Sequence, residues 1–170
     1  MILIKGNGGE NTEAKIAAFE KKWNISVPEP YRSFWCRYNG GVTDDAFVNF
    51  IEEEDNGTDV RKFYGLGTEK TWDDLNHYPY MDEWIENEVP TLPIARNIWG
   101  ELIVIGLEGE ERGKVFLVPC VMGFHDDEEP WLLGRSFEEF MERCYIDEAK
   151  WKEDCRSGKI NPDEWEEVRA

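Results

Sequence analysis

The sequence predicts an α+β fold: a mainly antiparallel twisted sheet of about four to six strands, with two N-terminal helices and C-terminal helices packed around it. Three observations support this prediction. Apolar residues recur at helical spacing near both ends of the chain. Apolar runs typical of strands lie between these segments, and short turn-forming stretches separate the runs.

The N-terminal part predicts a helix pair. Residues 2–4 are expected to be a short strand or an ordered arm, and a glycine-rich loop follows them. A first helix is predicted from Glu13, because Asn11 or Thr12 can cap it. Its apolar side carries Ile16, Phe19 and Trp23.

The clearest local signal is a second helix within residues 27–41. Pro28 and Pro30 mark its start, because proline suits the first turn, where an N–H is unpaired in any case. The next residues, Asn39-Gly40-Gly41, tolerate positive φ and end the helix. We expect its ring-bearing face to be buried; the rings belong to Tyr31, Phe34, Trp35 and Tyr38.

The middle of the chain predicts two hairpins. The first joins residues 46–51 to residues 60–64 through an acidic turn. The second, after a strand-like run at 92–95, joins residues 102–107 to residues 114–121.

The C-terminal part predicts helices. Ser136 and Glu139 form a capping box, and apolar residues from Phe137 to Tyr145 repeat at helical spacing. Helix is expected to continue from Asp147, and Asn161 can cap a short last helix. We therefore expect one domain over residues 1–170, with an N-terminal arm at 1–11 and an acidic, helical C-terminal extension at 147–170.

Composition restricts the class of partner. The chain has 37 Asp and Glu against 19 Lys and Arg, a formal charge of −18. Such a field repels nucleic-acid phosphate and attracts a basic partner, although a solvated surface is the alternative interpretation. No run of about twenty apolar residues occurs, so we expect no membrane partner and a cytoplasmic location.

No motif predicts catalysis or a cofactor. The four cysteines, with no C-x-x-C pairing, do not suggest zinc. The chain has only two histidines and no nucleophile motif, so we expect no enzyme. His125 beside Asp126 and Asp127 could ligate a metal ion, but a solvated acidic turn is the favoured interpretation.

A set of short motifs follows in a fixed order along residues 12–145. The motif residues are Pro28, Tyr31, Phe34, Asn39, Gly40, Gly41, Tyr64-Gly65-Leu66, Pro93-Ile94-Ala95, Gly100-Glu101, Ser136, Phe137 and Phe140. Their order resembles the SUKH superfamily, which includes bacterial immunity proteins against polymorphic toxins and fungal regulators of cell-wall synthesis. The resemblance implies a non-catalytic, protein-binding function, and the matched residues mostly specify the fold.

Acidic stretches with neighbouring rings are the candidate partner-binding residues. Carboxylates would steer a basic partner, and rings would anchor it. Trp131 is the favoured anchor, whereas Trp72, Trp84 and Trp99 are further rings with polar neighbours. The candidates are Glu52, Glu53, Glu54, Asp55, Asp73, Asp74, Asp126, Asp127, Glu128, Glu129 and Trp131.

The resemblance and the charge together favour an immunity protein, a monomer or weak homodimer that binds and neutralises a cognate bacterial toxin domain. The expected toxin is a basic nuclease, because such an enzyme keeps Lys and Arg around its cleft to hold phosphates. The main alternative is a regulatory or scaffold module that binds endogenous proteins. DNA mimicry and enzymatic function are the further alternatives.

Overall fold

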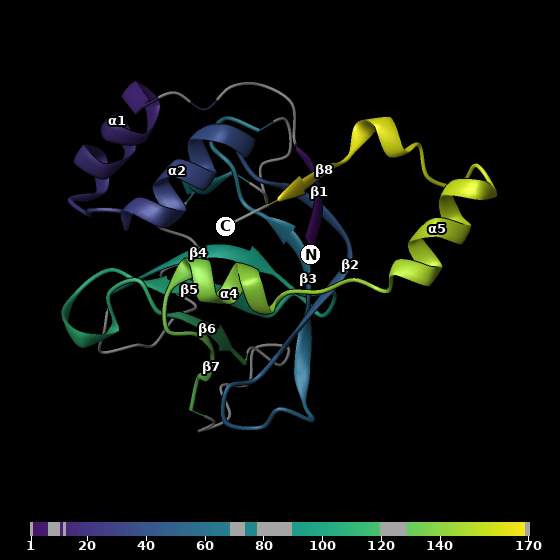
Figure 1. Ribbon diagram of the computed structural model, residues 1–170. Coiled ribbons are helices and arrows are strands. Elements are labelled where there is room, and N and C mark those ends of the chain that lie inside the picture. The colour runs from purple at the N-terminus through teal and green to yellow at the C-terminus, as the bar shows by residue number, and fades with distance from the viewer. Residues whose placement is uncertain are drawn as a thin grey trace.

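The computed structural model describes residues 2–6, 11, 13–68, 74–77, 90–119 and 129–168. These residues form an eight-stranded antiparallel sheet with four α-helices around it (Figure 1). The strands are β1 (Ile2–Gly6), β2 (Gly41–Asn49), β3 (Gly57–Phe63), β4 (Thr91–Arg96), β5 (Leu102–Gly106), β6 (Val115–Val118), β7 (Trp131–Gly134) and β8 (Glu166–Val168). The helices are α1 (Glu13–Trp23), α2 (Glu29–Tyr38), α4 (Phe137–Arg143) and α5 (Glu148–Arg156).

The sheet is a curled meander that returns to its start. Strands β1 to β7 pair with their neighbours in chain order, and β8 pairs with the free side of β1. The predicted α+β class is confirmed, and the two predicted hairpins correspond to β2–β3 and β5–β6. The predicted number of four to six strands is wrong, because β7 and β8 are too short to show alternation in the sequence.

Helix α2 forms the centre of the core, as its spacing predicts. All four of its rings are buried, and Tyr31 and Trp35 are fully buried. The ring centroids of Tyr31 and Phe34 each lie 5.2 Å from that of Phe137 in α4. On the sheet side, the Phe34 ring lies 4.9 Å from that of Phe63 in β3. The rings of α2 therefore join α4 to the sheet.

The helix stop after α2 is also a packing site. Asn39 has a left-handed φ of 47°, and its side chain both accepts from the N–H of Leu66 (2.8 Å) and donates to its carbonyl (3.1 Å). At Gly40 the φ is 78°, and an added Cβ would lie 2.7 Å from the carbonyl oxygen of Phe63. Two motifs that are far apart in the sequence therefore pack against each other: Asn39-Gly40-Gly41 (NGG) and Tyr64-Gly65-Leu66 (YGL).

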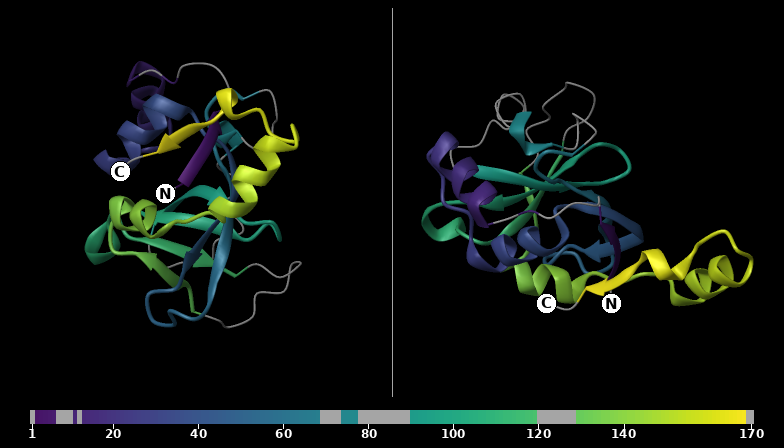
Figure 2. Two further views of the ribbon diagram at one scale, coloured as in Figure 1. Left: turned by 45° about the vertical axis from the view of Figure 1, so that its right-hand side comes forward. Right: turned by 90° about the horizontal axis from the view of Figure 1, so that it is seen from above.

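The C-terminal extension projects to one side of the sheet and then returns to it (Figures 1 and 2). Asp147 caps α5 by accepting the backbone N–H groups of Ala149 and Lys150, both at 3.0 Å. The extension is helical only in part, because it ends in β8, whose pairing with β1 closes the sheet. Within the predicted N-terminal arm, Ile2–Gly6 is β1, a strand between β2 and β8.

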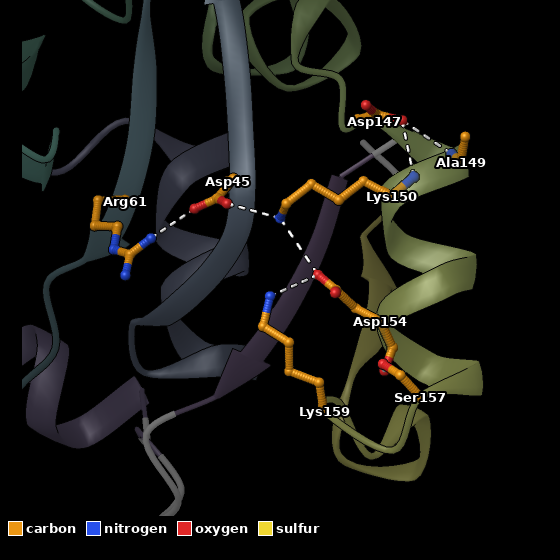
Figure 3. A network of polar contacts seen from close by, with 8 residues as sticks. All are labelled: Asp45, Arg61, Asp147, Ala149, Lys150, Asp154, Ser157 and Lys159. Atoms are coloured by element: carbon orange, nitrogen blue, oxygen red, sulfur yellow. Dashed lines mark hydrogen bonds and ion pairs between the residues drawn. The ribbon is translucent and has the colours of Figure 1, made fainter.

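Charged residues hold α5 beside β2 (Figure 3). A register shift in β2 precedes Ala46 and includes Asp45, which has a φ of 46°. The carboxylate of Asp45 accepts from Arg61 at 2.6 Å and from Lys150 of α5 at 3.0 Å. Lys150 in turn lies 3.4 Å from Asp154. The bulge thus turns one carboxylate toward the extension.

Candidate functional site

The candidate site lies at one end of the sheet. In an antiparallel meander, the connections between successive strands lie alternately at one end of the sheet and at the other. The β2–β3, β4–β5 and β6–β7 connections therefore share one end, and the β3–β4 and β5–β6 connections share the other. We call residues 50–56, 97–101, 129 and 130, which are described parts of the first group, the acidic end. It holds six carboxylates and no Lys or Arg; the six are Glu52, Glu53, Glu54, Asp55, Glu101 and Glu129.

The β2–β3 turn carries four of these carboxylates in a fixed loop. Its backbone is held because the N–H of Phe50 donates to the carbonyl of Asn56 (2.9 Å) and the N–H of Asn56 to that of Glu53 (2.9 Å). The side chain of Asn49 also donates to the carbonyl of Glu54. The side chains of residues 52–55 are exposed, and none forms an ion pair with another residue that the structure describes.

A ring stack joins this turn to the start of β7. The Phe50 and Trp131 rings are stacked, with centroids 4.8 Å apart and planes at 17°. Beside them, the N–H of Ile51 donates to the carbonyl of Leu132 at 3.0 Å. Glu129, which is exposed, precedes Trp131 by two residues. The structure thus brings together Glu52–Asp55 and Glu129–Trp131, two predicted stretches far apart in the sequence.

Trp131 is half-buried in this stack, so only part of its ring is free to meet a partner. The largest exposed ring of the acidic end is instead Trp99, in the β4–β5 turn, at 83%. Its neighbour Ile98 is 62% exposed. Trp99 was one of the further rings considered in the sequence, and Ile98 was missed. A large apolar residue in a turn between two strands was the available signal.

Asp74 lies at the other end of the sheet, in the β3–β4 connection, and is buried. One of its carboxylate oxygens accepts from the N–H of Gly67 (2.9 Å) and from the N–H of Asn76 (3.0 Å). Its carboxylate therefore holds a turn inside the fold and does not join the acidic end. The candidates Asp73, Asp126, Asp127 and Glu128, together with His125, Trp72 and Trp84, lie outside the described residues.

The acids of the acidic end differ from those elsewhere on the described surface. Many of the latter are paired, as Asp45 is with Lys150, whose hydrogen bond lowers the pKa of Asp45. Beside the acidic end, burial raises the pKa of Asp59, whose carboxylate accepts the N–H of Ile98 at 2.9 Å. Within the acidic end, Glu101 is half-buried and accepts from the side chain of Asn97. The other five acids are exposed and form no ion pair with another described residue, and they are what a basic partner would meet.

Neither a metal centre nor a membrane span is found in the described part of the chain. No three His, Cys, Asp or Glu side chains gather there to hold an ion. None of the helices described is long and apolar enough to cross a bilayer. A groove of about 300 Å³ lies between α2 and α4, with Phe34, Tyr38, Phe137 and Met141 among its lining residues. It is mainly apolar and lies apart from the acidic end.

Fold and site together define an α+β protein built on a curled antiparallel meander, with an acidic surface at one end of the sheet. The chain belongs to the SMI1/KNR4 family (SUKH-1), whose model matches residues 10–143. This confirms the resemblance to the SUKH superfamily and is consistent with an immunity or a regulatory protein. No curated protein and no solved structure gives a significant match. Strands β1 and β8 and helix α5 lie outside the matched residues.

Proposed function

We propose that this chain is an immunity protein that binds a cognate toxin domain, a basic nuclease, and blocks its active site without catalysis. The observation that carries the proposal is the acidic end. There the meander places six carboxylates from three separate segments together, with no basic residue among residues 50–56, 97–101, 129 and 130.

Charge complementarity favours a nuclease as the toxin. A nuclease that holds phosphates carries Lys and Arg around its cleft, and the exposed carboxylates of Glu52–Asp55 and Glu129 are complementary to that cleft. The formal charge of −18 adds long-range attraction, which raises the rate of encounter. The turn carrying Glu52–Asp55 is held by backbone hydrogen bonds, so little order has to be gained on binding.

Binding alone is sufficient for this function. An inhibitor that fills a catalytic cleft excludes the substrate and needs no reactive group of its own. We expect the protein to act in the cytoplasm of the cell that produces the toxin. One copy of the chain would bind one toxin domain. Family membership supports this proposal and equally supports a regulatory module that binds endogenous proteins.

Co-expression tests the proposal. The probe is the C-terminal domain of the protein encoded beside this gene, expressed in a sensitive host with and without the full chain. We expect the chain to restore growth and to co-purify with the probe as a stable complex. If the chain neither restores growth nor binds the probe, and pull-down gives several weak endogenous partners, the regulatory function is correct instead.

A further inference from the structure

The β4–β5 turn, Asn97 to Glu101, is closed by backbone hydrogen bonds and by the buried side chain of Asn97. Asn97 is 3% exposed, and its side-chain oxygen accepts from the N–H groups of Trp99 (3.0 Å) and Glu101 (2.9 Å). Its amide nitrogen donates to the hydroxyl of Thr58 (3.1 Å) and to the Glu101 carboxylate (2.6 Å). This side chain therefore fixes the turn and also attaches it to β3.

A further hydrogen bond attaches the backbone of Ile98 to β3. The N–H of Ile98 donates to the carboxylate of Asp59 in β3 at 2.9 Å. Gly100 closes the turn with a left-handed φ of 86°. The backbone of Ile98 and Trp99 is thus held from both sides, while their side chains are 62% and 83% exposed.

Exposing two large apolar residues on a fixed turn is unfavourable for a protein that stays free in water. It is favourable for binding, because the backbone is already ordered and the two side chains bury apolar area on contact. Tryptophan is also among the residues most enriched at energetically dominant interface positions. The turn lies beside Thr58 and Asp59, next to the β2–β3 turn that carries Glu52–Asp55.

We propose that Ile98 and Trp99 are the apolar anchor of the interface, inserting into an apolar pocket of the toxin domain whose rim is basic. This inference rests on the proposed function. Carboxylates of Glu52–Asp55 would then meet Lys and Arg around that pocket, in the usual arrangement of an apolar centre and a charged rim. The carboxylates set the rate of association and the anchor sets the rate of dissociation.

The charge of the surface decides between this occupant and others. A second copy of the chain would bring the same carboxylates to the contact, and like charges repel. An anionic membrane surface would be repelled for the same reason. A basic protein is the partner whose charge complements the surroundings of Trp99.

Binding kinetics of the full chain test the anchor. The probe is a catalytically inactive form of the toxin domain encoded beside this gene, measured with wild type, Trp99→Ala and Trp99→Phe. We expect Trp99→Ala to raise the dissociation rate at least about 30-fold and to change the association rate less than about threefold. Trp99→Phe, which keeps an apolar ring, should recover most of the loss.

The outcomes separate the two proposals. If wild type binds and Trp99→Ala dissociates at the same rate, the anchor is wrong and the immunity function stands. If wild type does not bind the probe, the immunity function is wrong and the anchor is withdrawn with it. Sedimentation gives a further check: a wild-type dimer that Trp99→Ala abolishes would make a second copy the occupant and overturn the inference.

Discussion

The rings of Phe50 and Trp131 are stacked 4.8 Å apart, and this contact joins the β2–β3 turn to the start of β7. Phe50 directly follows β2 and precedes the Glu52–Asp55 turn, and Trp131 follows Glu129 by two residues. The stack therefore sets how two acidic segments lie relative to each other. Trp99 makes no ring stack among the described residues, so the two tryptophans of one surface have different roles.

Replacing Trp131 should affect stability, and replacing Trp99 should not. Trp131→Ala removes a half-buried ring from its stack, which we expect to cost about 2 to 3 kcal/mol. Trp99→Ala truncates an exposed side chain and should cost less than about 0.5 kcal/mol. Urea unfolding of both variants measures the two costs. If Trp131→Ala lowers the free energy of unfolding as little as we expect for Trp99→Ala, the stack does not support the acidic end.

The close approach at Gly40 should make alanine unusually costly there. Gly40 and Gly67 both have positive φ, 78° and 64°, so alanine is strained by about 1 kcal/mol at either position. Only at Gly40 would the new Cβ also meet backbone at 2.7 Å, whereas Gly67 has nothing within 4 Å. We expect Gly40→Ala to exceed Gly67→Ala by at least about 1 kcal/mol in urea unfolding. If Gly40→Ala lowers the free energy of unfolding by no more than Gly67→Ala does, the packing of NGG against YGL is contradicted.

The contact between β2 and α5 should depend on pH. The hydrogen bond from Lys150 lowers the pKa of Asp45 below its ordinary value of 3.8. Such a carboxylate stabilises the fold above that value, and the stabilisation is lost as pH falls through the lower folded-state pKa. Both side chains are partly exposed, so its size at neutral pH should be about 0.5 kcal/mol or less.

Asp45→Asn tests this contact, because asparagine also tolerates the positive φ at this position. The variant should be slightly less stable than wild type at neutral pH. Its deficit should shrink both in high salt and as pH falls below 3.8. Urea unfolding across this range measures the difference. A deficit that grows as the pH falls would contradict the ion pair.

The parts of the fold that the sequence predicted are those with local signals. Helix α2 has a proline start, four rings at helical spacing and a left-handed stop at Asn39, and all three are present in the structure. The capping box is confirmed too, since the Ser136 hydroxyl accepts from the N–H of Glu139 at 3.1 Å. Each of these features lies within a few residues of chain, where the local sequence decides the geometry.

The parts that could not be predicted depend on pairing between distant segments. Strand β8 is a short segment, Glu166–Val168, and is a strand only because β1 offers it a free edge. Asp74 has the sequence neighbours of a surface acid, but the turn at Gly67 encloses it. The assembly of the acidic end follows from the order of the strands, which the sequence does not display.

The position of the carboxylates, more than their number, should determine binding. Glu53→Gln/Glu54→Gln removes two exposed carboxylates from the acidic end, and Glu108→Gln/Glu110→Gln removes two from the opposite end. Both double variants change the formal charge from −18 to −16. They are therefore matched in net charge and differ only in place.

The most direct measurement is the association rate of these two variants with the inactive toxin domain at low salt. We expect the acidic-end variant to associate at least about fivefold more slowly than wild type. The opposite-end variant should change by less than about twofold. Equal rates for the two variants would show that the acidic end is not the binding surface.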